Sequence, residues 1–376
     1  MVFLLIASFP DSILNFRGDL VRALINKGKE VHVASPDVPV GSQKRKNIEA
    51  LGCIVHNIPM SRVGLNPFHD FKTLWALWKL MRSVKPRFVL AYTVKPVIYG
   101  LICARLSGVA YRFALITGLG YSFQEPTKRL SPRILLTKLV QNLYSFSLRG
   151  CCCVFFQNTD DEDLFRERRL IDTSVKSVVV NGSGVDTSYY ATTPLPSQIK
   201  FLLIARLLGS KGVREYVEAA RQIKAQYPDT IFAVAGWIDE NPDAISLIEL
   251  ESWINEGLIC YLGRLSDVRP AIADCSVYVL PSYREGTPRT VLEALAMGRP
   301  IITTDAPGCR ETVVHGKNGF LVKVKDAEEI VKAMKAFIDQ PSLIGVMGEA
   351  SRSLAERKYD VHTVNGQMLA GMGIDQ

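Results

Sequence analysis

The chain has 376 residues, 48% of them hydrophobic, and this length favours two compact domains over a single core. Its formal net charge is +8. A transmembrane helix needs roughly 18 to 20 uncharged apolar residues, and none is expected because Arg105 and Arg112 interrupt the most apolar region. Residues 2–7 lack the basic region and the cleavage site of a signal peptide, so they indicate a first strand.

The first half alternates between short aliphatic runs and amphipathic stretches, which predicts parallel strands joined by helices on both faces of a sheet. Further strands are expected at residues 31–34, 53–58, 88–91, 111–116, 153–156 and 177–180. Helical patterns lie between them, at residues 16–28, 68–84, 96–107 and 131–148.

Residues 181–197 combine glycine, threonine and two prolines, a composition typical of a linker between domains. A second alternating series follows it. Its strands are expected at residues 201–204, 231–235, 259–262, 277–280, 301–303 and 320–322, and its helices near 211–226, 244–256, 289–297, 326–338 and 342–357.

The predicted fold is therefore α/β, with two doubly wound, Rossmann-like domains that face each other across a cleft. The first domain is expected over residues 1–190 and the second over residues 191–358, while residues 359–376 are expected to cross back to the first. Ligands of such folds bind at the carboxyl ends of the strands.

The eight cysteines lack the paired Cys-x-x-Cys spacing of a metal or redox site. We expect them to be buried and reduced in a cytosolic protein, because free cysteine is commonly a core residue.

The two halves differ in charge. Residues 1–197 carry 25 Lys and Arg against 14 Asp and Glu, whereas the remainder carries 20 against 23. Within residues 71–150, 13 side chains are basic and one, Glu125, is acidic. Such a field suits a phosphorylated ligand, an anionic membrane surface or nucleic acid.

Within this basic segment, cationic residues lie beside apolar ones. This pattern favours the interface of an anionic bilayer, although core packing with solvated charges explains it about as well. The residues are Trp75, Trp78, Lys79, Arg82 and Lys85 on one helical pattern, and Lys128, Arg129, Arg133 and Lys138 beside Ile134, Leu135, Leu136 and Leu139.

Glu285 and Glu293 lie eight residues apart, the first in a strand-to-helix loop and the second inside a helix that Pro288 could open. A helix start offers backbone N–H groups and about half a positive charge to a diphosphate. The two carboxylates could accept hydrogen bonds from sugar or ribose hydroxyls. On spacing alone, a capped and solvated helix start explains the pair better.

Arg206 and Lys211 follow the first strand of the second half, in the segment ARLLGSKG. A cation pair at this position could neutralise a leaving diphosphate, as a metal does elsewhere, although solvated surface charges explain it about as well. The pair together with the later glutamates is more specific than either alone. Gly236, and Gly263 with Arg264, follow neighbouring strands at the same edge.

The order ARLLGSKG, AVAGW, YLGRLSD, LPSYREGTPRTVLEALAMGRPIITTDAPGCRE and GFLV resembles the nucleotide-sugar half of the family 4 retaining glycosyltransferases of the GT-B fold. The resemblance spans nearly all of residues 199–359. It implies that Arg206 and Lys211 grip the donor diphosphate, that Glu285 contacts the transferred sugar and that Glu293 holds the ribose. The other donor-binding residues that it implies are Gly236, Arg264, Gly286, Thr287, Pro288 and Leu292.

The segments NFRGDLVRALINKGKEVHVASP, YTVKPVIYG and ALITGLGYSF resemble bacterial members that extend lipid-linked oligosaccharides, including N-acetylgalactosaminyltransferases that act on undecaprenyl-diphosphate-linked sugars. The resemblance implies that a first strand-to-helix loop faces the donor and that four further residues line the acceptor side. The loop residues are Asn15, Phe16 and Arg17, and the acceptor-side residues are Tyr92, Lys95, Gly118 and Gly120.

Two features bear on the mechanism that the resemblance implies. Several members place a histidine beside the reacting sugar, but no histidine falls in the YTVKP or GLGYSF segments, so no side-chain base is assigned. The run Asp160 to Asp163 contains an Asp-x-Asp, which binds a metal in another class of glycosyltransferases. Here Thr159 and Glu162 predict a capping box instead, and no metal or other cofactor is expected.

The resemblance implies a retaining transferase that moves a hexosamine-type sugar, such as N-acetylgalactosamine, from a UDP donor to a polyprenyl-diphosphate-linked saccharide. The enzyme would be cytoplasmic and peripheral on the inner membrane, with an anionic membrane surface and no nucleic acid among its partners. A two-domain sugar-nucleotide epimerase, a basic nucleic-acid-binding protein and a non-catalytic sugar-nucleotide sensor stay open as alternatives.

Overall fold

The computed structural model describes residues 1–61, 66–118 and 132–374, with side chains from residue 137 onward in the last range. It divides the chain into two compact units, Met1–Ser183 with His362–Gln376, and Gly184–Val361. The division lies a few residues before the domain boundary that we predict at residue 190. Among the described helices, none is both long enough and apolar enough to cross a bilayer.

The first unit contains a seven-stranded parallel sheet with the order β3-β2-β1-β4-β5-β6-β7. The chain winds outward from β1 in one direction and from β4 in the other, which is the doubly wound arrangement predicted from the sequence. The strands are β1 (Val2–Ile6), β2 (Glu30–Ser35), β3 (Ile54–Asn57), β4 (Phe88–Tyr92), β5 (Tyr111–Ile116), β6 (Cys153–Phe156) and β7 (Lys176–Val179).

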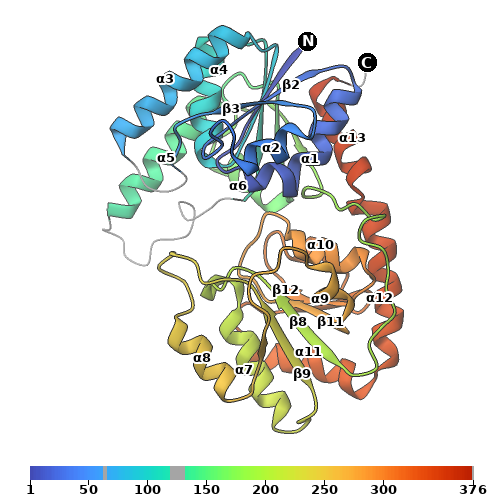
Figure 1. Cartoon of the computed structure of the whole chain (residues 1–376). Helices are drawn as coiled ribbons and strands as arrows, with labels where there is room; N and C mark the ends of the chain where they lie inside the picture. Colours follow the sequence, from blue (N-terminus) through green and yellow to red (C-terminus); the bar gives the residue numbers. More distant parts are fainter. Residues whose placement is uncertain (62–65, 119–131, 375–376) are drawn as a thin grey trace. The chain divides into compact units, whose positions relative to one another are not determined.

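Helices cover both faces of this sheet, because successive residues of each buried strand point to opposite sides and both sides are apolar. Phe3 and Leu5 of β1 pack on one face, and Leu4 and Ile6 on the other. The first face is covered by α1 (Asp11–Asn26), α2 (Gln43–Glu49) and α13 (Val361–Met372), and the second by α3 (Pro67–Val84), the π-helical turn η1 (Pro96–Gly100), α4 (Leu101–Leu106), α5 (Pro132–Leu148) and α6 (Thr159–Glu167) (Figure 1).

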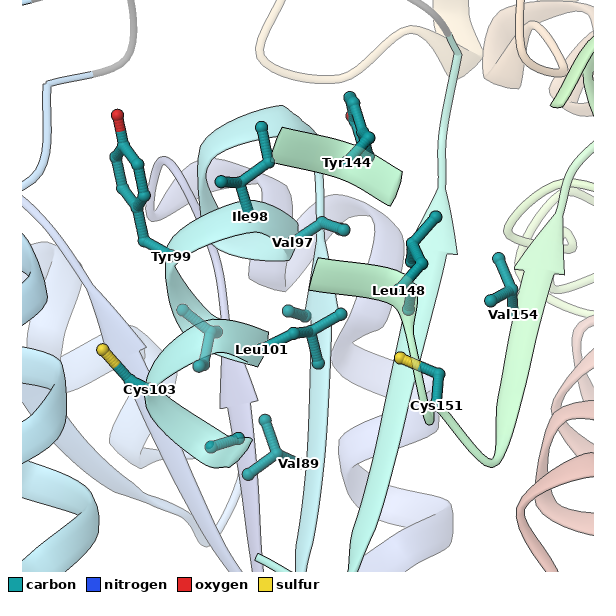
Figure 2. Packing of buried hydrophobic residues seen from close by; sticks show 14 of the residues in the cluster. Val89, Val97, Ile98, Tyr99, Leu101, Cys103, Tyr144, Leu148, Cys151 and Val154 are labelled. Carbon is teal, nitrogen blue, oxygen red and sulfur yellow. The ribbon is translucent and has the colours of Figure 1, made fainter. Parts of the chain in front are cut away.

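The core on the second face of the sheet lies where η1 and α4 pack against α5 and the strands. Figure 2 shows the side chains of Val97, Leu101 and Leu148 gathered between these elements and the strands. The hydroxyl of Tyr99 points away from them, so this residue contributes its ring to the core and keeps its polar atom at the margin. Truncating a buried Leu in such a core to Ala costs about 2 to 5 kcal/mol.

The second unit contains a six-stranded parallel sheet with the order β10-β9-β8-β11-β12-β13. Its strands are β8 (Lys200–Ile204), β9 (Ile231–Ala235), β10 (Cys260–Tyr261), β11 (Val277–Leu280), β12 (Ile301–Thr304) and β13 (Gly319–Val322). Its helices are η3 (Gly209–Lys211), α7 (Val213–Lys224), α8 (Leu247–Asn255), α9 (Arg269–Ala273), α10 (Arg289–Ala296), η4 (Arg310–Thr312), α11 (Ala327–Asp339), α12 (Ser342–Leu354) and η5 (Ala355–Tyr359).

The predicted linker is in part packed onto this second unit by the buried guanidinium of Arg299, which is 1% exposed. Arg299 donates to the carbonyls of Thr193 and Pro194 in the linker, at 3.0 and 3.1 Å, and to that of Ile272 at 3.0 Å. A planar group with five N–H donors can hold several carbonyls at once. The segment after Gly184 is therefore part of the second unit.

The doubly wound α/β fold is confirmed, and three local predictions were wrong. Helix α1 begins at Asp11, five residues before the predicted start at residue 16. The N-cap of α6 is Asn158, whose side chain accepts the N–H of Asp161 at 2.7 Å, and not Thr159. All eight cysteines are free, but two of them, Cys152 and Cys260, are exposed.

Candidate active site

The charged residues that the sequence singles out in the second unit lie on loops that follow neighbouring strands. Strand β11 pairs with β8 on one side and with β12 on the other, so the loops after these three strands meet at one edge of the sheet. Arg206 follows β8, Glu285 follows β11, and Gly308 follows β12. A ligand at this edge could contact all three loops.

Lys211 and Glu285 form an ion pair between the first two loops. Lys211 ends η3, and Gly212 then turns the chain with φ 72° into α7. A Cβ at Gly212 would lie 2.2 Å from the carbonyl oxygen of Pro281, so the close approach of the two loops requires glycine. The N–H of Tyr283 donates to the carbonyl of Ser210 at 2.9 Å and fixes the same approach.

Two more hydrogen bonds hold Glu285, one at its carboxylate and one at its backbone. Its Oε1 accepts the hydroxyl of Ser282 at 2.7 Å, and its backbone N–H donates to the carbonyl of Pro307 at 2.9 Å. Gly308 adopts φ 78°, and a Cβ there would lie 2.2 Å from the carbonyl oxygen of Glu285. The third loop therefore supports the backbone of Glu285, a role for Gly308 that our sequence analysis missed.

Glu293 lies in the second turn of α10 and is 6% exposed. Its Oε1 accepts the hydroxyl of Tyr190 at 2.9 Å and the Nε–H of Arg289 at 3.0 Å. Burial raises the pKa of Glu293, while the Arg289 charge and the two hydrogen bonds act in the opposite direction. Tyr190 lies in the segment interpreted as a linker, so the sequence did not indicate it as a site residue.

Arg206 and Arg264, both predicted to bind the donor, contact other side chains of the same edge. Arg206 forms an ion pair with Asp239 at 3.0 Å. The guanidinium of Arg264 lies 4.7 Å from the ring centre of Trp237, which is a cation–π contact. Gly236 has φ 152°, and a Cβ there would lie 1.8 Å from the carbonyl oxygen of Ala205, so its strand end can approach β8 only as glycine.

The remaining predicted donor residues surround the start of α10. Pro288 is the N-cap, Gly286 and Thr287 precede it, and the hydroxyl of Thr287 donates to the carbonyl of Gly286 at 3.0 Å. The side chain of Leu292 is fully buried in the core under α10. Leu292 can therefore affect ligand binding only indirectly, by fixing the position of α10.

In the first unit, Asn15, Phe16 and Arg17 do not form the first strand-to-helix loop. They lie in the second turn of α1, because Pro10 and Asp11 already begin the helix. The loop prediction was therefore wrong. Arg17 is 2% exposed, and its guanidinium lies 5.5 Å from the ring centre of Tyr92.

Tyr92 ends β4 with its side chain fully buried, and its hydroxyl lies 2.8 Å from the Oγ of Ser12. Burial raises the pKa of Tyr92 to about 12, so the phenol is neutral at physiological pH. Tyr92 therefore forms a contact between β4 and α1.

Lys95 lies just before η1 and donates to the carboxylate of Asp70 in α3 at 2.9 Å, with side-chain exposures of 11% and 12%. Burial and the nearby charge of Asp70 raise the pKa of Tyr99. Gly118 has φ 117°, a value that favours glycine. Gly120, the last residue predicted on the acceptor side, lies outside the described residues.

The second unit thus brings two cations, the carboxylate of Glu285 and a helix start together at one set of loops, with the buried carboxylate of Glu293 in the helix that follows. Such loops can bind a phosphorylated, hydroxyl-rich ligand. Tyr92 and Lys95, two of the residues predicted on the acceptor side, make contacts within their own unit. Over the described residues, no group of three or more His, Cys, Asp and Glu side chains is placed to hold a metal ion.

Two family models match the chain, one in each half. The model of "Glycosyl transferases group 1" matches residues 192–356, and that of "Glycosyl transferase 4-like" matches residues 4–158. The matched segments include the loops with Arg206, Lys211 and Glu285 in the second half, and α1, Tyr92 and Lys95 in the first.

Two curated relatives are similar over most of their length. The N,N'-diacetylbacillosaminyl-diphospho-undecaprenol alpha-1,3-N-acetylgalactosaminyltransferase of Campylobacter jejuni is 28% identical over 346 residues, 88% of each chain. The UDP-Gal:alpha-D-GlcNAc-diphosphoundecaprenol alpha-1,3-galactosyltransferase of Escherichia coli is 26% identical over 306 residues, 78% of this chain and 76% of the relative.

Among solved structures, the Anabaena protein HepE in complex with UDP is similar along the whole chain, with a TM-score of 0.76 and 17% identity. The similarity covers 99% of this chain and 100% of the other. At this level of identity, the comparison shows a common fold.

Proposed function

Because the chain belongs to the family 4 glycosyltransferases of the GT-B fold, we propose that it transfers a sugar from a UDP donor with retention and without a metal. The acceptor in this proposal is a saccharide linked to a polyprenyl diphosphate, and the sugar is of the hexosamine type. The product would belong to a bacterial surface glycan or to the glycan of a glycoprotein.

The proposal rests on the ion pair of Lys211 with Glu285, which joins the loop after β8 to the loop after β11. An ammonium group at this edge would attract the donor diphosphate, and α10 begins four residues after Glu285. Oxygen acceptors for sugar hydroxyls are present in the same loops. Arg206 adds a second cation, which would leave Asp239 for a phosphate when the donor binds.

The roles of the two glutamates differ in this proposal. Glu285 lies in the loop and would accept a hydrogen bond from the transferred sugar, whereas the buried Glu293 would accept hydrogen bonds from the ribose. Neither acts as a nucleophile. The bond from the anomeric carbon to the diphosphate breaks, the bond to the acceptor oxygen forms on the same face, and the acceptor proton passes to the departing UDP.

The choice of donor and acceptor rests on the relatives. The names of both curated relatives specify a sugar carried on diphospho-undecaprenol, and that of the Escherichia coli relative specifies UDP-Gal. HepE was solved with UDP. A polyprenyl-linked acceptor would bring this enzyme to the cytoplasmic face of the inner membrane as a peripheral protein.

The test is a panel of UDP-sugars offered to the purified protein with and without a polyprenyl-diphosphate-linked disaccharide. We expect acceptor-dependent release of UDP that favours a UDP-N-acetylhexosamine, and a product in which the anomeric configuration of the donor is kept, as measured by NMR. A chelator should leave the rate unchanged, since cationic side chains take the role of the metal.

Three results would overturn parts of this proposal. Inversion at the anomeric carbon would exclude retention, and loss of activity with the chelator would exclude metal independence. A product that still carries UDP, formed without any acceptor, would instead identify an epimerase.

A further inference from the structure

Helix α3 carries four large aromatic side chains that face solvent. Phe68, Phe71, Trp75 and Trp78 are 85%, 67%, 57% and 37% exposed, and we call them the aromatic stripe. Their spacing of three, four and three residues places them on one side of the helix. The rings of Trp75 and Trp78 lie 5.4 Å apart, so the stripe is continuous at this end.

The stripe lies opposite the side by which α3 packs on its own unit. The buried residues of this helix are Asp70, Thr73, Leu77 and Met81. At 100° per residue, the mean direction of these residues lies about 135° from that of the stripe. The outward side of a surface helix is usually polar, so α3 has one apolar side more than the fold needs.

The charges around the stripe are positive. Lys72, Lys79 and Arg82 are exposed on the same helix, the last two in the turns that follow the aromatic residues. The one carboxylate of α3, Asp70, is buried and paired with Lys95. Along residues 71–150 of the sequence, the only acidic residue is Glu125.

The neighbouring helices carry similar surfaces. Helices α4 and α5 cover the same face of the sheet as α3 (Figure 1), and they expose Leu106, Leu139 and Phe146 at 72%, 49% and 47%. The guanidinium of Arg105 lies 5.7 Å from the ring centre of Phe146. Apolar anchors beside cationic side chains thus occur on all three helices.

We propose that the aromatic stripe inserts into the interface of a bilayer with anionic headgroups, with Lys79 and Arg82 against the lipid phosphates. Aromatic rings prefer the headgroup region, and basic residues beside them add attraction to anionic lipid. A second copy of this chain does not suit the surface, because a symmetric contact through α3 would bring cations against cations. The inference rests on the proposed function, which brings the enzyme to a lipid-borne acceptor.

The first experiment measures binding of the full chain to vesicles by sedimentation. We expect binding to phosphatidylcholine mixed with phosphatidylglycerol and much weaker binding to phosphatidylcholine alone. Replacing Phe68, Phe71 and Trp75 by serine should lower the partition coefficient about 100-fold or more. Lys79→Gln and Arg82→Gln should each lower it about fivefold, with a smaller effect at high salt.

A matched control comes from the second unit. Leu247 and Ile248 in α8 are 58% and 80% exposed, and the double change to serine should leave vesicle binding unchanged. A circular dichroism melt of each variant checks the fold, which exposed residues should not affect. Equal vesicle binding by the wild type and the triple serine variant would overturn the inference, as would loss of binding in the control.

Fluorescence locates the inserted residues directly. Brominated lipid should quench the tryptophan emission of the wild type, whereas Trp75→Phe with Trp78→Phe should keep vesicle binding and lose the quenching. Quenching that persists through Trp237 and Trp253 would contradict insertion by α3. A lipid-independent dimer that the triple serine change abolishes would identify a second copy as the occupant and overturn the inference.

Vesicle binding needs neither donor nor acceptor, so it can fail independently of catalysis. Transfer to a short-chain acceptor without vesicle binding would overturn this inference alone. Vesicle binding without transfer from any UDP-sugar would overturn the proposed function alone.

Discussion

The two units use their charged residues in different ways. In the second unit, the ion pairs of Lys211 with Glu285 and of Arg289 with Glu293 lie within loops and a helix start at one sheet edge. In the first unit, the largely buried pair of Lys95 with Asp70 joins the start of η1 to α3, whereas Lys72, Lys79 and Arg82 of α3 face solvent. A sequence motif identifies the charged residues at the sheet edge of the second unit. The solvent-facing basic side chains of the first unit can be recognised only from their exposure in the structure.

The largest expected effect tests the second unit. Glu285→Gln keeps the shape of the side chain and removes its charge, so we expect kcat to fall about 1000-fold. The affinity for UDP itself should stay unchanged, because the proposed contact of Glu285 is with the sugar. Steady-state rates and calorimetric titration with UDP measure the two effects.

Glu328→Gln is the matched control, since Glu328 is exposed in the first turn of α11. It should leave both quantities unchanged. A Glu285→Gln enzyme with wild-type kcat would remove Glu285 from the reacting site.

The next effect tests whether Lys95 is structural. Lys95→Met leaves the buried carboxylate of Asp70 without its cation, so the free energy of unfolding should fall by about 3 kcal/mol. UDP affinity should not change. Urea denaturation followed by circular dichroism gives the stability.

Asp70→Asn in the Lys95→Met background should recover part of the lost stability, because no buried charge is left. A Lys95→Met protein as stable as the wild type, but with a raised KM for the acceptor, would instead assign Lys95 to the acceptor site.

The smallest effect concerns the buried carboxylate of the second unit. Tyr190→Phe removes the hydrogen bond of 2.9 Å to Glu293, and we expect UDP to bind about five- to tenfold more weakly at neutral pH. That bond opposes the burial that raises the pKa of Glu293, so its loss raises the pKa further. Ribose hydroxyls bind the ionised carboxylate more strongly than the neutral acid. The affinity should therefore fall as the pH drops through this pKa, and the fall should begin at a higher pH in the variant.

Titration with UDP between about pH 5 and pH 8 measures this shift. Tyr189→Phe is the control, because its ring lies against the Arg269 guanidinium, 3.9 Å from the ring centre, and its hydroxyl has no part in the proposal. Parallel pH profiles for wild type and Tyr190→Phe would mean that Tyr190 only supports the fold.

Much of the fold could be predicted from the sequence, because the strands of a covered parallel sheet are nearly continuous apolar runs. The predicted ranges at residues 111–116, 153–156, 231–235 and 277–280 coincide with β5, β6, β9 and β11. Helix starts were harder to place. The start of α1 depends on Pro10 and Asp11, which precede the apolar pattern.

The candidate site could be predicted only in part. Glu285 and Lys211 belong to loops whose sequences carry a family pattern, and the structure brings them into contact. The contributions of Tyr190 and Gly308 come from distant segments, and nothing in their local sequence indicates what they touch. In the first unit, Arg17 was predicted in a loop and Tyr92 on the acceptor side, but both are buried, Arg17 in α1 and Tyr92 at the end of β4.

The return of the last helix has a consequence for synthesis of the chain on the ribosome. Val364, Met368, Leu369 and Met372 of α13 belong to a core of the first unit, beside Phe3 and Leu5 of the first strand. At about 5 to 20 residues per second, the ribosome needs roughly 10 to 35 s to make the intervening second unit. Throughout that time one apolar side of the first sheet is covered by α1 and α2 but not by α13, whereas the second unit is complete once it leaves the exit tunnel.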